Sequence, residues 1–88
     1  MKLGLVFGYW SAQPNHQAVP LAQEAERLGY DSVWTAEAWG SDAFSPLAYL
    51  AAHTSTIALA TGIIILPQRN PLVLAKELAS VDVVSGGR

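Results

Sequence analysis

The chain has 88 residues, no cysteine and a net charge of −2, and 51% of its residues are hydrophobic while only 14% are charged. This length suits one small domain, and the lack of cysteine excludes disulfides, cysteine-ligated zinc and iron–sulfur clusters. Because the basic residues are few and scattered, and no apolar run approaches the roughly 18 residues of a membrane span, we expect neither nucleic acid nor a membrane as partner. Met1-Lys2 does not open a signal peptide, so we expect a cytoplasmic protein.

The first half of the chain contains two predicted strands with a helix between them. Leu3–Phe7 is a short apolar run, which indicates a buried strand. From Ala18 to Leu28 the apolar residues recur at helical spacing, and Gly29 supplies a stop signal for that helix. Ser32–Thr35 then predicts a second short strand.

The second half repeats this alternation. Ser45-Pro46 has the pattern of a helix cap followed by proline, and it predicts the start of a second helix. A third strand is expected at Ile57–Leu66, because its run Ile63–Leu66 is apolar without alternation, which is typical of a strand covered on both faces. Asn70-Pro71 predicts the start of a third helix that runs to about Val83, and Ser85-Gly86-Gly87-Arg88 predicts a turn.

The resulting order, β-α-β-α-β-α, is typical of an α/β fold with a parallel sheet and right-handed crossovers. A doubly wound sheet is one option, but only one glycine follows the first strand, where a dinucleotide site needs G-x-G-x-x-G. The other option is a (β/α)8 TIM barrel, which takes about 250 residues. We interpret residues 1–88 as the first three βα units of such a barrel, an incomplete barrel that forms the N-terminal part of a single domain.

The end of the third strand is the leading candidate for a binding site. Gly62 stands inside an apolar run, where glycine usually marks a bulge or a close approach by a ligand. In α/β enzymes the sites gather at the C-terminal ends of the strands, where Glu37 also follows the second strand. Glu37 is therefore a candidate acid or base, with a solvated loop carboxylate or an ion-pair partner of Arg69 as the alternatives.

Four segments together resemble a known family. They are Trp34-Thr35-Ala36-Glu37, Leu59-Ala60-Thr61-Gly62-Ile63, Arg69-Asn70-Pro71 and Val81-Asp82-Val83-Val84-Ser85-Gly86-Gly87-Arg88. This ordered set resembles the N-terminal region of luciferase-like flavin-dependent oxidoreductases, and within them the branch that uses the deazaflavin coenzyme F-420. The resemblance implies a (β/α)8 barrel and a hydride-transfer enzyme.

The resemblance also implies where the cofactor lies. In the family the ring rests against a bulge of the third strand that contains a cis non-proline peptide, which corresponds here to Gly62-Ile63. The end of the second strand, Ala36-Glu37-Ala38, also contacts the cofactor; many deazaflavin relatives carry Asp-His there, and this chain has no histidine at that point. The implied cofactor-binding residues are Ala36, Glu37, Thr61, Gly62 and Ile63. For Thr61 the alternative is ordinary strand packing, and for Arg69 the alternatives are a cofactor phosphate and a structural ion pair.

Three aromatic residues stand at predicted strand ends or in loops. Tyr9, Trp10 and Trp39 are expected to line a substrate pocket, because ligand sites are largely apolar, with core packing as the alternative. His16 and His53 lie on different elements and have no metal-binding spacing, so we expect no metal.

The sequence therefore predicts part of an oxidoreductase that moves a hydride between coenzyme F-420 and an unknown organic substrate. One alternative is an FMN-dependent monooxygenase of the same superfamily, and another is a catalytically inert, truncated or assembling half-barrel. The expected partners are a small-molecule substrate and either the remainder of the barrel or another copy, with a homo-oligomer at full length. For the isolated 88 residues we expect no turnover, because three βα units cannot enclose a cofactor.

Overall fold

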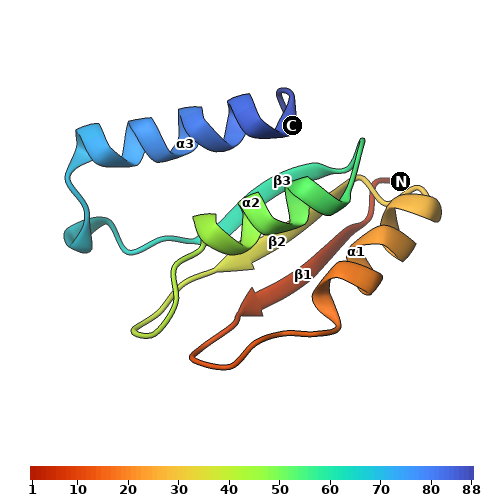
Figure 1. Ribbon diagram of the computed structural model, residues 1–88, viewed down its shortest axis with the longest axis horizontal. Coiled ribbons are helices and arrows are strands. Elements are labelled where there is room, and N and C mark those ends of the chain that lie inside the picture. The colour runs from red at the N-terminus through yellow and green to blue at the C-terminus, as the bar shows by residue number, and fades with distance from the viewer.

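The computed structural model describes all residues from 1 to 88, as three strand–helix units in series (Figure 1). The elements are β1 (Gly4–Tyr9), α1 (Ala18–Arg27), β2 (Ser32–Ala36), α2 (Phe44–His53), β3 (Ala58–Ile63), a short 3-10 helix (Leu66–Gln68) and α3 (Pro71–Ser85). This order confirms the predicted alternation of strands and helices. No helix has the length and apolarity to cross a membrane.

The three strands form one parallel sheet in the order β1-β2-β3. Leu5, Val33 and Leu59 stand in register across it, and the three strands therefore end at the same edge. Each strand neighbours the next one in the chain, as in the opening strands of a (β/α)8 barrel. The predicted α/β fold with a parallel sheet is confirmed.

Both outer strands change register next to Thr35 of β2. In β1 the pairing passes from Val6 to Gly8, and in β3 it passes from Thr61 to Ile63, so Phe7 and Gly62 are each one residue in excess. The bulge predicted at Gly62 is confirmed. The cis peptide expected with it is wrong, because every peptide bond in the structure is trans. The extra residue by itself bends the strand, which is how a bulge re-aims the chain beyond it.

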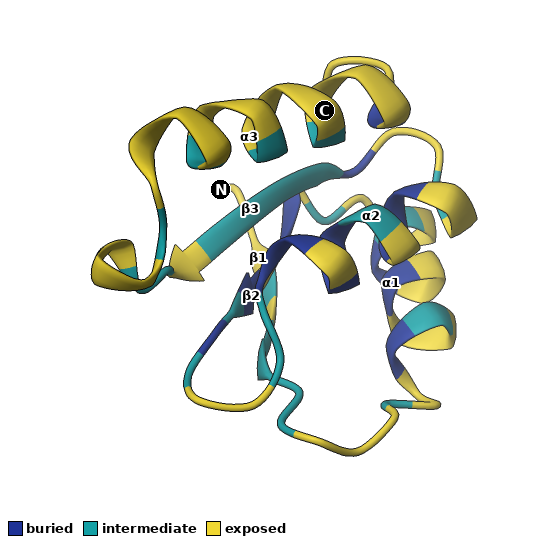
Figure 2. Ribbon diagram, turned by 60° about the vertical axis from the view of Figure 1, so that its left-hand side comes forward, coloured by how far each residue is buried: buried dark blue, intermediate teal, exposed yellow.

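The core lies between the sheet and the first two helices. Its buried members are Ala18, Ala22, Ala25, Val33, Leu50 and Ile57. Figure 2 shows buried residues on the inner sides of α1 and α2, whereas α3 is exposed over most of its length. Small alanines along α1 let this helix lie close to the sheet, and apolar burial then stabilises the first two units.

The start of α2 differs from the prediction. The helix begins at Phe44, one residue before the predicted cap Ser45. Its N-cap is Ala43, which makes no side-chain capping bond, and the carboxylate of the preceding Asp42 accepts a hydrogen bond from the Ser45 N–H at 3.3 Å. Pro46 is accordingly the third helical residue and not the first. Proline is tolerated there because the first-turn N–H groups have no partner within the helix.

The two ends of the third unit also differ in how well the sequence predicts them. The strand β3 ends at Ile63 instead of Leu66, because the chain turns away after the bulge and enters the 3-10 helix. For α3 the predicted start is confirmed: the Asn70 side chain accepts from the Leu72 N–H at 2.8 Å, and Pro71 is the first helical residue. The helix runs to Ser85, slightly beyond the predicted Val83.

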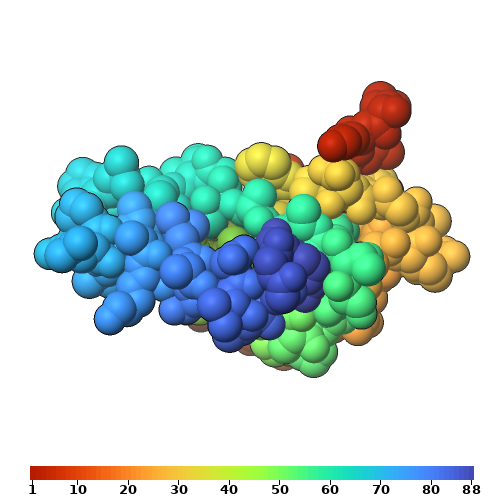
Figure 3. Space-filling model, turned by 90° about the horizontal axis from the view of Figure 1, so that it is seen from above, coloured from red at the N-terminus to blue at the C-terminus, as the bar shows by residue number.

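A cavity of about 450 Å³ separates α3 from the layer below it. Its lining comes from α2, β3, α3 and the last residue, and consists of Phe44, Leu47, Leu59, Thr61, Leu78, Ala79, Val81, Asp82 and Arg88. Seen from above, a hollow lies between the blue helix α3 and the teal strand β3, with green atoms at its floor (Figure 3). The third helix therefore stands off the sheet, and the element that it contacts is α2.

Candidate functional site

The C-terminal ends of the three strands bring the predicted site residues to one edge. Tyr9 of β1, Ala36 of β2 and Ile63 of β3 stand side by side in the sheet register, directly after the two bulges. Bulges beside one edge of a sheet commonly re-aim side chains at functional sites. This edge, with the loops that follow each strand, is the candidate site.

Glu37 follows β2 and is almost entirely enclosed, with 2% of its side chain exposed. One carboxylate oxygen accepts a hydrogen bond from the Ile65 N–H at 2.7 Å, and the other accepts from the Ala43 N–H at 3.0 Å. The backbone N–H of Glu37 also donates to the Ile63 carbonyl at 3.1 Å. Glu37 thus joins the end of β2 to the N-terminus of α2 and to the segment just beyond the bulge.

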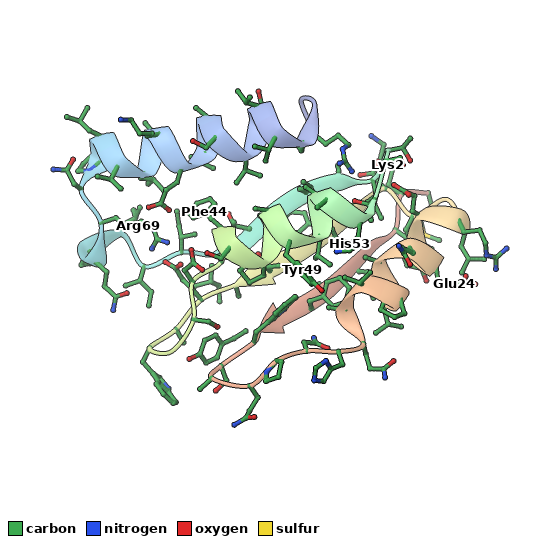
Figure 4. All side chains as sticks on the ribbon, in the orientation of Figure 1. Lys2, Glu24, Phe44, Tyr49, His53 and Arg69 are labelled. Atoms are coloured by element: carbon green, nitrogen blue, oxygen red, sulfur yellow. The ribbon has the colours of Figure 1, made fainter.

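Arg69 closes the other side of this carboxylate. Its two terminal nitrogens donate to the two oxygens of Glu37, one of them at 2.9 Å, and its Nε donates to Glu77 of α3 at 3.3 Å. The guanidinium also lies over the Phe44 ring, 5.2 Å from the ring centre, and Figure 4 shows the two side chains as neighbours. Only 10% of the Arg69 side chain is exposed. Of the alternatives predicted for Arg69, the structure contains the ion pair.

The electrostatics of this pair favour two opposite charges. Burial raises the pKa of Glu37, but the hydrogen bonds from Ile65, Ala43 and Arg69 outweigh burial and bring the pKa below its ordinary value. Burial lowers the pKa of Arg69, and the hydrogen bond and charge of Glu37 raise it by more. Glu37 is therefore an ionised carboxylate whose oxygens already face donors on the protein.

The remaining predicted cofactor residues divide into two groups. Ala36, Gly62 and Ile63 lie together at the strand edge, where Gly62 and Ile63 are exposed. A Cβ added at Gly62 would meet only the Thr35 carbonyl oxygen, at 3.7 Å, so the backbone is open to close approach there. Thr61 instead lines the cavity beneath α3, on the side of the sheet that the helices cover.

Two of the three predicted pocket aromatics come together. The Tyr9 and Trp39 rings meet edge to face with 6.2 Å between their centres, and Trp39 is 82% exposed. The Tyr9 hydroxyl accepts a hydrogen bond from the Gly40 N–H, and a Cβ at residue 40 would clash with that hydroxyl. Glycine at residue 40 therefore lets the loop after β2 lie against Tyr9 without displacing its hydroxyl.

Trp10 is separate from this pair. Its side chain packs against the core, and its Nε1 is buried without a hydrogen-bond partner. The core-packing alternative describes its position in the structure.

Sequence reasoning did not identify a small polar pocket next to the ion pair. This pocket has a volume of about 110 Å³ and is lined by Glu37, Ala38, Trp39, Gly40, Ser41, Asp42, Gln68 and Arg69. Ser41 Oγ is buried here with no hydrogen-bond partner. The glycine between Trp39 and Ser41 was the available signal, since glycine in a loop often marks close packing of backbone. No group of three His, Asp or Glu side chains is arranged to hold a metal ion.

Comparison with known proteins gives a consistent result. Residues 5–88 match the sequence profile of the luciferase-like monooxygenase family. A Mycobacterium tuberculosis protein, whose name assigns it provisionally as a coenzyme F-420-dependent oxidoreductase, is 48% identical over the whole chain, which corresponds to 25% of that relative's length.

Two solved structures share the fold. The coenzyme F-420-dependent tetrahydromethanopterin reductase of Methanopyrus kandleri has a TM-score of 0.86 and 27% identity, over 99% of this chain and 25% of its own. A monooxygenase from Streptomyces bottropensis has a TM-score of 0.84 and 28% identity, over 100% of this chain and 31% of its own. The chain thus spans about a quarter of the length of the curated relative and of the reductase.

Proposed function

The chain belongs to the luciferase-like monooxygenase family, and from this premise we propose that the protein containing it transfers a hydride between a deazaflavin coenzyme and an organic substrate. The reductase of Methanopyrus kandleri, which shares the fold, depends on coenzyme F-420, and the Mycobacterium tuberculosis relative is named for the same coenzyme. The observation that carries the proposal is the edge where Tyr9, Ala36 and Ile63 stand in register beyond two bulges. When bound, a deazaflavin supplies or accepts the hydride, and the protein supplies position and electrostatics.

The residues at this edge fit a flat, largely apolar ring. Ala36 and Gly62 present little side chain, so a ring can approach the backbone closely, and Ile63 offers an exposed apolar surface. We assign these three residues to contact with the cofactor. Thr61 and Glu37 would act through the strand and not by touching the ring, because Thr61 lines the opposite side of the sheet and the Glu37 oxygens bind protein donors.

Tyr9 and Trp39 are the residues we assign to the substrate. Their edge-to-face pair is held in place by the Gly40 contact, and the exposed Trp39 ring leaves an apolar surface at the same edge as the proposed cofactor contacts. An aromatic wall of this kind suits an apolar or ring-containing organic substrate.

The second candidate function is an FMN-dependent monooxygenase. The matching family profile and the Streptomyces bottropensis enzyme support this alternative. The first three units do not separate the two functions, because phosphate-binding parts of such barrels come from the loops after the seventh and eighth strands.

The test is a cofactor titration of the longest translated product that contains residues 1–88. We expect it to bind coenzyme F-420 at least tenfold more tightly than FMN, followed by the absorbance or fluorescence of each cofactor. Tighter binding of FMN would favour the monooxygenase, and binding of neither would reject both functions.

The variant Gly62→Val tests the proposed contact with the bulge. A side chain at residue 62 has room next to Thr35, so we expect the variant to fold. It would occupy the space proposed for the ring and weaken cofactor binding by about tenfold or more, as overpacking a close contact does. Ala52→Val adds bulk on the exposed face of α2 and should leave the dissociation constant within about twofold of the parent. Equal affinity of the parent and Gly62→Val would remove the bulge from the site.

A further inference from the structure

The segment after the bulge is fixed at two points by one residue. The Glu37 N–H donates to the Ile63 carbonyl at 3.1 Å, and the Glu37 carboxylate accepts from the Ile65 N–H at 2.7 Å. Backbone and side chain of the same residue therefore hold the chain on both sides of Ile64. Since β3 has no further ladder bonds after Ile63, these two contacts determine where the strand end points.

Glu37 also contacts the neighbouring helix α2. Ala43 is the N-cap of α2 and donates its N–H to Glu37 Oε2 at 3.0 Å, while its carbonyl accepts the Thr35 hydroxyl at 2.8 Å. A carboxylate at this helix end interacts favourably with the helix dipole. The N-terminus of α2 is therefore a rigid support for the carboxylate that holds the strand end.

Arg69 balances the negative charge of the Glu37 carboxylate and fixes its orientation. Because its two terminal nitrogens face the two Glu37 oxygens, the guanidinium fixes the plane of the carboxylate as well as its charge. Two oxygens that bind two backbone N–H groups and a guanidinium have little capacity left to accept a substrate proton. Such a carboxylate is suited to holding backbone and not to acid–base chemistry.

We propose that the Glu37–Arg69 pair is a positioning element that sets the Gly62–Ile63 wall against which the cofactor rests, and that Glu37 is not the acid or base of the reaction. The proposal rests on the proposed function, since it concerns the same edge. In this proposal the pair does not touch the cofactor ring. It affects the position of the ring by fixing the backbone of residues 63 to 65.

The test compares four proteins, each as the longest translated product that contains residues 1–88. They are the parent, Glu37→Gln, the double variant Glu37→Gln with Arg69→Met, and the control Glu77→Gln. The control removes the other carboxylate that contacts Arg69 but does not touch residues 63 to 65. Each is titrated with coenzyme F-420 and with FMN well below its thermal midpoint, and the absorbance band of the bound cofactor is recorded.

We expect Glu37→Gln to weaken binding by about tenfold and to shift the band of the bound cofactor, because the strand end moves while the protein stays folded. The double variant should recover at least threefold of this loss, since it removes the unpaired buried charge of Arg69. Glu77→Gln should match the parent in affinity and band position.

Each of the other outcomes contradicts one statement of the proposal. If the parent binds but Glu37→Gln leaves both affinity and band unchanged, the pair is only structural and the inference fails while the proposed function stands. If the double variant is no better than Glu37→Gln, the unpaired charge of Arg69 is not what moves the strand end, and the role assigned to Arg69 is overturned. If the parent binds neither cofactor, the proposed function fails and the inference fails with it.

Discussion

The first two βα units and the third are held together by different forces. Around α1 and α2 the contacts are apolar, with alanines of α1 and Leu50 of α2 fully buried against Val33. Along α3 only Ser85 is buried, while Leu72, Leu78 and Val83 are exposed. The same kind of unit therefore occurs once as a packed layer and once as a helix that stands above a cavity.

Two arginines hold this outer helix at its ends. Arg69, which stands just before α3, binds both Glu77 in the second turn of this helix and Glu37 after β2. At the other end the Arg88 guanidinium donates to the Ser85 carbonyl at 2.7 Å, to the Ala51 carbonyl at 3.0 Å and to the Thr54 hydroxyl at 3.0 Å. These groups lie at the C-termini of α2 and α3, where a cation is favoured. Polar contacts near both ends of α3 thus add to its contact with α2, since α3 has no apolar packing on the sheet.

The largest expected effect comes from truncating one leucine in each region. In the 88-residue chain, Leu50→Ala should lower the free energy of unfolding by about 3 kcal/mol or more, because it leaves a void in a closed core. Leu78→Ala should cost under about 1 kcal/mol, because Leu78 is 49% exposed and lines a cavity that already exists. Urea titration followed by tryptophan fluorescence measures both. Equal costs would mean that α3 packs as tightly as α2, and the comparison would fail.

A smaller effect is expected from Arg88. Arg88→Met should destabilise the 88-residue chain by about 2 kcal/mol, because several carbonyl and hydroxyl groups lose a charged donor. Arg88→Lys keeps the charge but not the planar fork, and should fall between Arg88→Met and the parent. Hydrogen exchange should locate the loosening in the last turn of α3. Faster exchange in α1 instead would show that Arg88 supports the core and not the third unit.

Local patterns predicted the elements of both regions well. The spacing of apolar residues predicted α1, and Asn70-Pro71 predicted the start of α3, because a cap and a proline act on the residues next to them. The glycine inside β3 predicted the bulge for the same reason. The start of α2 was missed because two local signals competed: the side chain that binds a first-turn N–H is Asp42 and not Ser45.

The site depended on contacts that no local pattern encodes. Glu37 and Arg69 are 32 residues apart, and Tyr9 and Gly40 are 31 apart, so their pairing follows from the sheet register and not from sequence spacing. Sequence reasoning placed Glu37 at the right edge and considered Arg69 as its partner. It did not foresee that both Glu37 oxygens would bind backbone N–H groups, because such bonds depend on where the loops after β2 and β3 end.

The first two βα units also have a polar contact, made by Glu26. Its contribution to stability depends on pH, whereas that of the apolar contacts does not. Glu26 of α1 accepts hydrogen bonds from the N–H groups of Thr56, Ser55 and Ile57, at 2.6, 2.8 and 2.9 Å. The bond from Thr56 leads the causes that lower the pKa of Glu26 from 4.5 to about 2, against the opposing effect of burial. Because the pKa is lower in the folded state, this contribution is complete above about pH 4.5 and is lost as the pH falls toward 2.

Glu26→Gln should therefore cost on the order of 1 kcal/mol at pH 7, after allowance for solvent screening, and its difference from the parent should shrink as the pH falls from 5 toward 2. Unfolding free energies measured at several pH values test this. Glu37 also has a lowered pKa, so the variant should keep part of the acid sensitivity of the parent. A constant difference between the two proteins down to pH 2 would show that Glu26 contributes by packing its chain and not by its charge. Charged side chains would then stabilise only the third βα unit, and the first two units would depend on apolar packing alone.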